Sequence, residues 1–433
     1  MATTAVTGAK NLGSTGVLYS DRRDFYIRPN VVKELWTDVT PFLTVVANQQ
    51  TVSGMADPTF KMFEHRNPWQ KQQFQSAANP AAVASGAEST SIATDNAEGI
   101  QPGANYKGLM CDVFSDSSGP SGGSKGQVLI TEYASSGDSI KYKNLTNEDI
   151  NVADDDWFVV IGNAQGEGTN SPAAWSDDLS VVYNSTQIFK TPVEVTGTLL
   201  QASLRGESKE LARLRDQKSA EHKIQKERSF IFGSNPKGTS GGFANIEDIT
   251  DENDKTVRTT MGILTALARY GSSSGDAQNV FASGDIDTYS EFVDAMEKVF
   301  QYVPTSGSKR AFVGAGALGY WSKQGGNAGS FAGDSGWTVN LGDMKRDALG
   351  FNYRTLETPH GMLQLIPTPA LRGPYNKHML IVSDENLFHA QYRAPQFQAS
   401  IQANDYDGVK DQYMSDEGIG ISLMESHALM VTP

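Results

Sequence analysis

The sequence has a single cysteine, no long apolar run and no surplus of basic residues, and each shortage excludes a class of protein. Cys111 has no second cysteine to pair with, so the chain forms no internal disulfide, which fits a reducing compartment. No stretch of about 18 consecutive apolar residues occurs, so we expect no membrane-spanning helix. The segment Met1–Val6 has neither a basic flank nor an apolar run, so we expect no secretory signal.

Basic residues are outnumbered by acidic ones. The chain has 36 Lys and Arg against 50 Asp and Glu, a formal net charge of −14. It is therefore not expected to hold nucleic acid by general electrostatic attraction, which needs clustered Lys and Arg, although it can lie beside DNA. The acid is concentrated, because Glu88–Lys190 contains 15 Asp and Glu against 5 Lys, a net of −10.

Apolar residues are also scarce, at 38% of the chain, whereas glycines number 42. This composition predicts many loops and extended segments around modest cores. The length of 433 residues predicts about two or three structural units.

The first half of the chain predicts short helices and short strands. Residues 1–29 are small and polar and predict an extended arm, followed by a helix at Val31–Thr37 and a second helix that starts at Pro41 after a Thr40 cap. Residues 58–64 predict a strand. Beyond it lie four β-like runs, which together predict a small β domain in the acid-rich region: Gly108–Phe114, Gln127–Tyr133, Trp157–Gly162 and Leu179–Phe189.

The segment Glu207–Phe232 predicts one long charged helix, because it lacks proline and glycine and is dense in good helix formers. Gly233 follows it, where a left-handed glycine commonly ends a helix. Glu210–Arg213 and Lys223–Glu227 are spaced as ion pairs along the helix. Its apolar stripe is thin, which predicts a helix packed on one side only, and the stripe consists of Leu204, Leu211, Leu214, Ile224 and Ile231.

The second half mixes helices and strands. Thr256–Tyr270 and Thr288–Tyr302 predict helices, and the second is amphipathic through Phe292, Met296 and Val299. Several strand-like runs follow: Arg310–Val313, Tyr353–Leu356, Met362–Ile366, His378–Val382, Gly418–Met424 and His427–Val431. Regular βαβ alternation is absent, so we expect an α+β protein rather than a doubly wound one.

Motifs for catalysis, cofactors or metals are weak. Gly314–Gly319 matches G-x-G-x-x-G after a strand, but we expect no long helix after it, so a dinucleotide site is not predicted. The six histidines lack metal-ligand spacing and none neighbours Cys111. The Asp154–Asp156 run lacks the spacing of a calcium loop and predicts a solvated turn. We therefore predict no catalytic, cofactor-binding or metal-binding residue, and no cofactor.

The order of parts resembles the major capsid proteins of tailed bacteriophages with the HK97-type fold, and in particular the SU10-like major head protein subfamily. Thr191–Thr198 running into the long helix is similar to the strand that enters the spine helix of that subfamily. Arg258–Gly262 resembles the start of its next helix. The ending, Tyr413–Met424 with His427 and Ala428, is similar to its final strands.

The resemblance implies an α+β, HK97-like capsid fold with an N-arm, an E-loop, a P-domain that carries a long spine helix, and an A-domain. It also implies a β-rich domain inserted in the E-loop region. The implied boundaries in the first half are 1–50 for the N-terminal arm and short helices and 51–198 for the E-loop region, with the inserted acidic domain at about 105–189. In the second half they are 199–255 for the spine helix and connection, 256–389 for the A-domain, and 390–433 for the C-terminal P-domain strands.

The function that the resemblance implies is structural, without enzymatic activity. The chain is expected to self-assemble into hexamers and pentamers of an icosahedral shell that encloses phage double-stranded DNA. Implied partners are other copies of the chain, a separate scaffolding protein, a portal and a cement or decoration protein. DNA in the interior is not bound by sequence, and no membrane is involved. The expected location is the virion, after assembly in the host cytoplasm.

Three other functions compete with this interpretation. An encapsulin-like compartment shell uses the same fold around an enzyme cargo. A nucleotide-dependent enzyme would use the Gly314–Gly319 loop. An adhesive β-rich surface protein would need a secretory signal, which the start of the sequence does not indicate.

Overall fold

The computed structural model describes most of the chain and divides it into two compact units. One unit comprises Met1–Met62 and Val181–Pro433, and the other comprises Phe63–Ser180. The predicted arm at 1–29 and the predicted helix Val31–Thr37 lie outside the described residues. The described residues are 40–65, 72–78, 80–98, 106–115, 123–134, 139–169, 179–201, 210–236, 249–274, 278–287, 289–302, 307–326 and 343–433.

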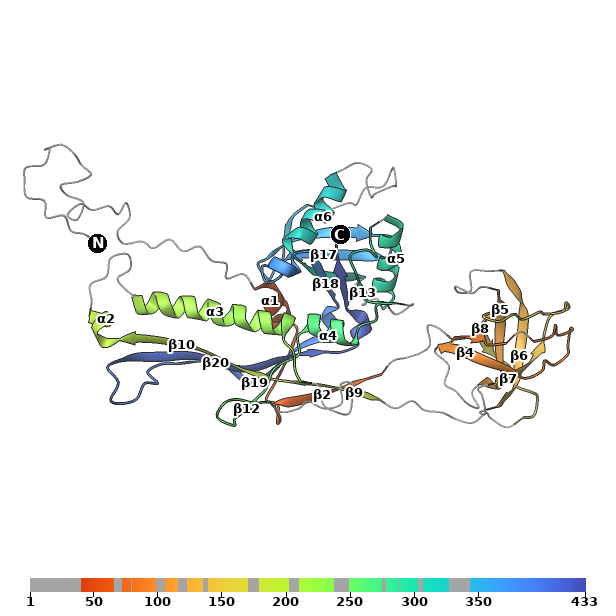
Figure 1. Ribbon diagram of the computed structural model, residues 1–433, viewed down its shortest axis with the longest axis horizontal. Coiled ribbons are helices and arrows are strands. Elements are labelled where there is room, and N and C mark those ends of the chain that lie inside the picture. The colour runs from red at the N-terminus through yellow and green to blue at the C-terminus, as the bar shows by residue number, and fades with distance from the viewer. Residues whose placement is uncertain are drawn as a thin grey trace, which may run out of the picture. The chain divides into compact units, whose positions relative to one another are not determined.

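A long helix lying along a sheet dominates one end of the first unit (Figure 1). Helix α3 runs over Glu210–Phe232, which confirms the predicted helix from Glu210 onward. The sheet has four strands in the order β1-β19-β20-β10. Their bounds are Gln50–Ser53, Leu387–Gln398, Gly408–Ile421 and Gln187–Thr196.

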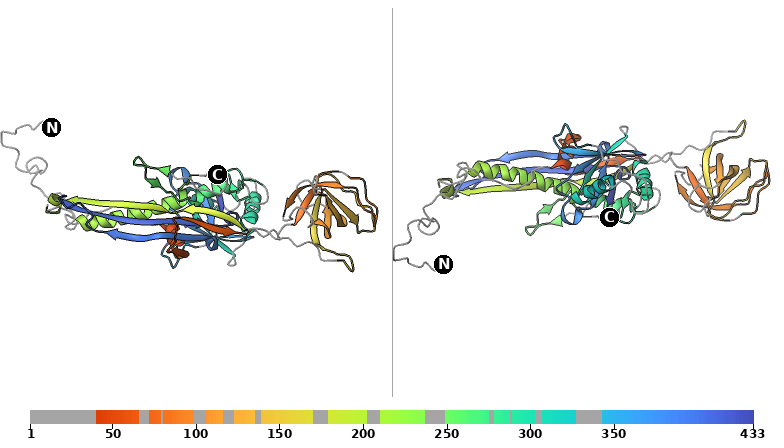
Figure 2. Two further views of the ribbon diagram at one scale, coloured as in Figure 1. Left: turned by 90° about the horizontal axis from the view of Figure 1, so that it is seen from below. Right: turned by 90° about the horizontal axis from the view of Figure 1, so that it is seen from above.

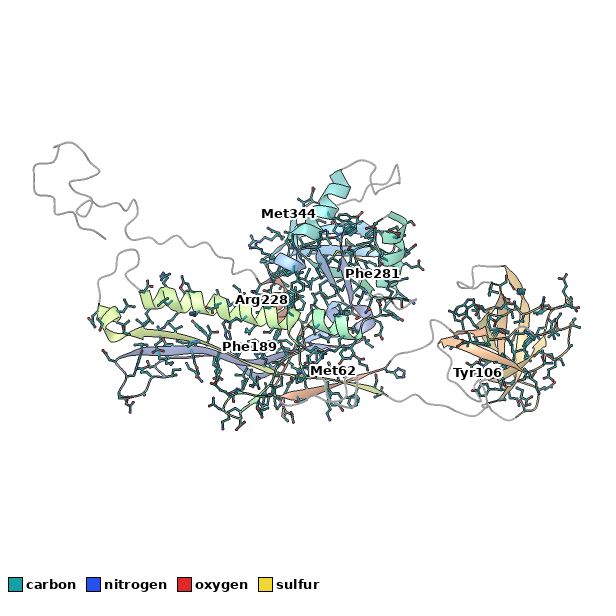
Figure 3. The ribbon with its side chains drawn as sticks, in the orientation of Figure 1. Met62, Tyr106, Phe189, Arg228, Phe281 and Met344 are labelled. Carbon is teal, nitrogen blue, oxygen red and sulfur yellow. The ribbon has the colours of Figure 1, made fainter. Side chains whose placement is uncertain are left out.

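Strands β10 and β20 are antiparallel over their whole paired length, from Gln187 opposite Glu417 to Thr196 opposite Gly408. Along β10, residues from Phe189 to Val195 alternate between buried and exposed, as expected when one face is covered. The two turned views show α3 following the direction of these strands (Figure 2). Phe189 lies between helix and sheet, and its ring centroid is 6.4 Å from that of Phe230 (Figure 3).

The remainder of this unit is built on a seven-stranded mixed sheet with the order β13-β21-β18-β14-β17-β16-β15. In sheet order the strands are Val280–Phe281, Ala428–Val431, His378–Val382, Ser308–Val313, Gly361–Pro367, Asn352–Thr358 and Lys345–Arg346. The runs predicted for β14, β16, β17, β18 and β21 are confirmed. The last strand of the chain, β21, thus joins this sheet and not the one under α3.

The two faces of the seven-stranded sheet pack against different helices. Ala311 and Val313 on β14 belong to a core shared with α5 (Tyr289–Phe300) and α6 (Ala315–Gly326). Phe312, between them, belongs to a second core with α1, α3 and α4. Its ring meets that of Phe42 on α1 edge-on, with centroids 5.0 Å apart. Burial of Phe292, Met296 and Val299 confirms the predicted amphipathic helix, although α5 ends at Phe300 and not at the predicted Tyr302.

Shorter elements complete this unit. Helix α1 covers Pro41–Asn48 with Pro at its first turn, as predicted, but Thr40 makes no side-chain capping bond. Strands β2 (Thr59–Glu64) and β9 (Ser180–Ser185) form a two-stranded sheet, as do β11 (Ile249–Thr250) and β12 (Thr256–Val257). Further short helices are α2 (Gly197–Gln201), α4 (Ile263–Tyr270) and three 3₁₀ turns at Gly373–Tyr375, Asp384–Asn386 and Met424–Ser426.

The helix predicted at Thr256–Tyr270 is wrong in its first part, because α4 begins only at Ile263. Gly262 lies against the end of α3 and its N–H donates to the Gly233 carbonyl at 2.9 Å. A Cβ on Gly262 would stand 2.6 Å from the Ile231 carbonyl oxygen. The chain is therefore held extended until it has passed α3.

Gly233 ends α3, but not in the predicted left-handed conformation, since it is not among the glycines with positive φ. It is needed instead for close packing. A Cβ there would lie 2.3 Å from the Ser229 oxygen and 2.4 Å from the Thr260 oxygen. The glycine thus lets two backbone segments touch at the end of the long helix.

The second unit contains a closed six-stranded antiparallel barrel in the order β3-β4-β7-β6-β5-β8. The bounds from β3 to β8 are Gln73–Ser76, Ile92–Glu98, Leu109–Phe114, Ser124–Ala134, Ser139–Asn144 and Trp157–Asn163. Three of the predicted β runs are confirmed as β5, β6 and β8. The fourth, Leu179–Phe189, is divided between β9 and β10.

Aromatic rings fill the barrel interior. Phe74 stacks on Phe158 with centroids 4.9 Å apart, and Tyr106 meets Phe74 edge-on at 5.4 Å. Figure 3 labels Tyr106 within this unit. At one end, the buried Asp156 carboxylate accepts from Lys125 Nζ at 2.5 Å and from the Ala153 N–H at 2.6 Å. The predicted solvated turn at Asp154–Asp156 is therefore wrong for Asp156, which is 3% exposed.

Candidate functional site

The glycine motif at Gly314–Gly319 is followed by a helix, contrary to the sequence expectation, because α6 covers Ala315–Gly326. Its N-terminus is already occupied by Asn376. The Asn376 side chain accepts from the Gly316 N–H at 2.8 Å and its carbonyl accepts from the Ala317 N–H at 3.1 Å. A Cβ on Gly314 would stand 2.2 Å from the Asn376 oxygen. Gly314 and Gly316 thus allow close packing against Asn376, which takes the N–H groups that a pyrophosphate would need.

Residues able to bind metals are dispersed in the described part of the chain. No group of three His, Cys, Asp or Glu side chains is arranged to hold an ion there. Cys111 lies inside the barrel, where burial raises the pKa of its thiol. His427 is buried in the first unit; burial and the charge of Lys309 lower its pKa to about 3, and its Nδ1 accepts from the Ser383 N–H. Among the described helices, none is long and apolar enough to cross a membrane.

The most unusual chemistry of the first unit is a row of polar and charged side chains buried between α3 and β20. Arg215 reaches Asp411 at 2.7 Å, and the Asp411 side chain is fully buried. Lys226 reaches Glu417 at 3.0 Å, and the Glu417 side chain is also fully buried. We call Asp411, Ser415 and Glu417, with their partners on α3, the polar row.

His222 lies in the middle of the polar row. Its Nδ1 is 3.0 Å from Thr191 Oγ1 on β10, and its Nε2 is 3.1 Å from Ser415 Oγ on β20. Burial, together with the charge of Lys226, lowers the His222 pKa to about 4, and Glu417 only partly offsets this. The imidazole is thus neutral near pH 7 and connects the helix to two strands by hydrogen bonds.

Glu417 has a third neighbour, since His389 Nε2 on β19 is 3.6 Å from its carboxylate. Burial alone would raise the pKa of Glu417, but His389 and the positive charge of Lys226 together hold it below its ordinary value. The acid is therefore ionised in the folded chain. The adjacent residue, Asp416, points to the other side of the sheet, where it meets Arg393 at 3.4 Å and Arg258 at 3.5 Å.

The buried face of α3 differs from the predicted apolar stripe. Leu211, Leu214 and Ile224 are only partly buried, and Leu204 lies outside the described residues. The buried side chains are Ala220, His222, Lys226, Glu227, Phe230 and Ile231. The predicted pair of Lys223 with Glu227 is also wrong. Glu227 turns toward α1 and accepts from the Leu43 N–H at 3.4 Å, and burial raises its pKa to about 8.

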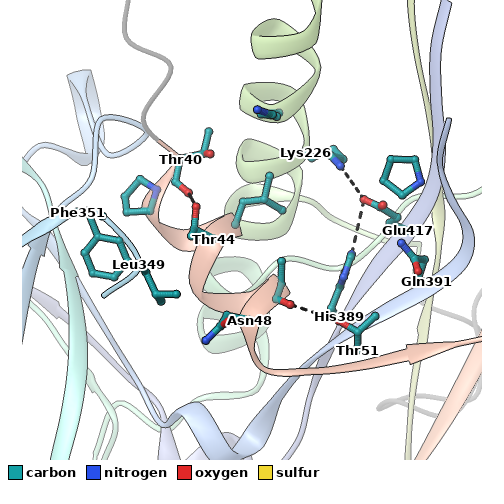
Figure 4. Close-up of a pocket in the computed structure, with 16 residues that line it drawn as sticks. Thr40, Thr44, Asn48, Thr51, Lys226, Leu349, Phe351, His389, Gln391 and Glu417 are labelled. Carbon is teal, nitrogen blue, oxygen red and sulfur yellow. Dashed lines mark hydrogen bonds and ion pairs between the residues drawn. The ribbon is translucent and has the colours of Figure 1, made fainter. Parts of the chain in front are cut away.

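A pocket of about 790 Å³ adjoins the polar row (Figure 4). Lys226, Glu417 and His389 lie at one side of it, and α1 and the segment Leu349–Phe351 form others. Its lining residues are Thr40, Pro41, Leu43, Thr44, Ala47, Asn48, Thr51, Lys223, Lys226, Leu349, Gly350, Phe351, His389, Gln391, Pro395 and Glu417.

The sequence analysis did not identify the polar row, but its pattern is visible afterwards. His222 and Lys226 are four residues apart and so share a helix face. Ser415 and Glu417 are two residues apart and so share a strand face. Their partners come from distant parts of the chain, which a single sequence does not reveal. The row offers ion pairs and hydrogen bonds between elements. It includes a hydroxyl–imidazole pair, Ser415 with His222, but these side chains are 0% and 5% exposed, so the pair is enclosed between helix and sheet.

Comparison with known proteins identifies the class as a structural shell protein. The sequence matches the family described as SU10 major capsid protein over residues 19–431. A search of curated proteins finds no match. The chain therefore belongs to the SU10 major capsid protein family, and its function is that of a major capsid protein of a phage shell.

Solved capsid structures are also similar to the chain. The structure titled "Capsid of native GTA particle computed with C5 symmetry" has 10% identity and a TM-score of 0.46, with 98% of this chain and 99% of that chain covered. Microbacterium phage Oxtober96 has 11% identity and a TM-score of 0.39, covering 93% and 95%. The holo-SrpI encapsulin complex from Synechococcus elongatus PCC 7942 has 8% identity and a TM-score of 0.38, covering 59% and 77%.

Proposed function

We propose that the chain assembles into hexamers and pentamers of an icosahedral shell that encloses double-stranded phage DNA. The observation that carries this proposal is the family match over residues 19–431, which includes nearly the whole chain. The formal net charge of −14 is compatible with packaged DNA that is enclosed and not gripped by the shell. The protein acts without catalysis.

The exposed surface of the first unit supports association with other copies. Large apolar side chains lie where β10 and β19 end and where α2 and β20 begin, and such exposed patches mark protein contacts. Their exposed fractions are 39% for Leu199, 41% for Leu200, 43% for Phe397, 39% for Ile401 and 37% for Tyr406. Neighbouring copies would cover these side chains in a shell.

The proposed domain layout follows the capsid fold. Residues 1–50 would form the N-terminal arm and short helices, and 51–198 the E-loop region. We assign its inserted β-rich domain to the barrel, whose strands span Gln73–Asn163, in place of the bounds of about 105–189 expected from the sequence. Residues 199–255, with α3 as the spine helix, and 390–433 would form the P-domain. The seven-stranded sheet within 256–389 would form the A-domain, to which β21 adds a strand.

The proposed partners follow from shell assembly. A separate scaffolding protein would direct assembly in the host cytoplasm, a portal would join the shell, and a cement or decoration protein would bind the finished shell. The mature location is the virion. These partners are proposed from the family. The role of each can be tested by adding or omitting the corresponding protein during assembly.

Negative-stain microscopy of the expressed chain, alone and with its scaffolding protein, tests the proposal. Closed icosahedral particles, or free hexamers and pentamers, are the expected result. A monomer that stays monomeric at high concentration even with the scaffold would contradict it. Particle contents separate the two shell functions, because packaged DNA supports the phage capsid and a packed enzyme supports an encapsulin-like compartment.

A further inference from the structure

The pocket beside the polar row carries more positive than negative charge. Lys223 and Lys226 both line it, and the carboxylate of Glu417 is the single acid in its lining. Lys226 is already paired with Glu417 at 3.0 Å. Lys223 is exposed and makes no ion pair with any residue that the structure describes. One lysine charge at the pocket is thus left without a carboxylate.

The same pocket also has an unused hydrogen-bond acceptor. Oε1 of Glu417 lacks a hydrogen-bond partner although the side chain is fully buried, whereas Oε2 faces Lys226 at 3.0 Å. Buried polar atoms without partners are costly, so an occupant that brings N–H donors is favoured.

A peptide segment that contains Asp or Glu provides both a carboxylate for Lys223 and N–H donors for the buried acceptor. Its carboxylate pairs with Lys223, and its backbone N–H groups reach an acceptor that a phosphate, which is itself an acceptor, could not satisfy. The pocket size is in the range of binding sites, which hold about 300–1,000 Å³. An extended segment could also pair with the edge of β19, because β1 pairs with this strand only as far as Gln391 among the described residues.

We propose that this pocket binds an acidic peptide segment from a second copy of the chain. The inference rests on the proposed shell function, since it needs copies to meet. Charge complementarity favours this source, because each copy carries 50 Asp and Glu against 36 Lys and Arg. Lys223 contacts the incoming carboxylate, and Leu349, Phe351 and Pro395 border the segment with apolar surface.

Charge reversal at Lys223 tests the proposal in the full-length chain. Lys223→Glu is expected to raise the protein concentration needed for particle assembly by about tenfold or more, because a charge pair at an interface is replaced by a repulsion. Lys223→Arg keeps the charge and should assemble as the wild type does. Arg228→Glu is the matched control, since Arg228 is also exposed on α3 and does not line the pocket.

Two outcomes of this comparison overturn the inference. In one, Lys223→Glu assembles like the wild type; in the other, Arg228→Glu is impaired to the same degree. Thermal unfolding of the unassembled variants shows whether each is folded, so a folding defect is recognised. Failure of the wild type itself to form particles contradicts the shell function, which separates the two failures.

Carbodiimide crosslinking identifies the source of the carboxylate. Particles assembled from a mixture of ¹⁴N-labelled and ¹⁵N-labelled copies are treated with the reagent, which joins lysine to a nearby Asp or Glu, and digested for mass spectrometry. Crosslinked peptides of Lys223 that combine the two labels support the proposal. Lys223 peptides crosslinked only within one label, or loss of packaged DNA in Lys223→Glu particles that assemble normally, would overturn it.

Discussion

The barrel and the helix-covered sheet bury their side chains in different ways. The barrel interior consists of apolar and aromatic residues, with Phe74 and Phe158 stacked at its centre. The contact between α3 and β20 instead buries ionised groups, with Asp411 and Glu417 each facing a cation from the helix. Apolar packing is non-directional, whereas an ion pair needs one particular partner at one distance.

This difference indicates separate roles for the two kinds of contact. Ion pairs buried from water add little net stability compared with apolar packing, because desolvation of both groups offsets their attraction. Such ion pairs do strongly oppose a displacement of the helix along its sheet, because a shift of α3 along β20 would leave Glu417 and Asp411 without their cations. We infer that the polar row fixes the position of the long helix on its sheet, and that the barrel relies on its core.

The largest expected effect is in the barrel. Phe158→Ala removes a fully buried ring and is expected to lower the free energy of unfolding of the barrel by about 4 kcal/mol. Hydrogen exchange measures this in each unit separately. Amides within Gln73–Asn163 should exchange faster, and those of β10 and β20 should not change. Equal acceleration in both units would show that the barrel does not unfold on its own.

The next effect concerns the polar row. Lys226→Met leaves the Glu417 carboxylate buried without its cation and is expected to cost about 3 kcal/mol. The double variant Lys226→Met with Glu417→Leu should recover to within about 1 kcal/mol of the wild type, because no charge is left buried at the pair. Urea unfolding gives both values. A double variant as unstable as the single one would mean that the ion pair itself provides net stability.

A smaller effect depends on pH. Burial raises the pKa of Glu227 to about 8, from an ordinary 4.5, so the folded chain keeps this proton where the unfolded chain has lost it. The free energy of unfolding should therefore fall as pH rises from about 4.5 to 8. Glu227→Gln keeps an acceptor for the Leu43 N–H and should remove this slope, and it should exceed the wild type in stability by at least about 1 kcal/mol above pH 8.

Urea titrations of both proteins across this pH range provide the measurement. Parallel pH profiles would place the Glu227 side chain in water and not against α1. The comparison with Glu417 is direct, because both acids are buried beside α3 but only Glu417 has a cation at 3.0 Å. One acid is thus expected to be neutral and the other ionised near pH 7.

Secondary structure followed from the sequence wherever the pattern is local. The spacing of Phe292 and Met296 and the strand-like run His378–Val382 each predict an element that the structure contains. The start of α4 was missed, because it depends on Gly262 touching Ile231 in another helix. The helix α6 was missed because its glycine-rich sequence has low helix propensity, which packing against Asn376 and the core overrides.

The polar row could not be predicted for a related reason. A charged helix with a thin apolar stripe is expected to place its charges in water, yet Lys226 has a side chain only 9% exposed. Its burial depends on Glu417, which is 191 residues away in the chain. Sequence periodicity reports which residues share a face, and it does not report which distant residue lies opposite them.

The smallest expected effect concerns a predicted pair that the structure confirms at the start of α3. Arg213 forms an ion pair with Glu210, three residues before it, and both side chains are about one quarter exposed. Pairs of this kind stabilise a helix by about 0.2–0.5 kcal/mol, and water screens this one further. Arg213→Ala is therefore expected to change the free energy of unfolding by less than about 0.5 kcal/mol, measured by urea unfolding at low and high salt. A loss comparable with that of Lys226→Met would mean that the first turns of α3 are held by ion pairs as strongly as its buried middle.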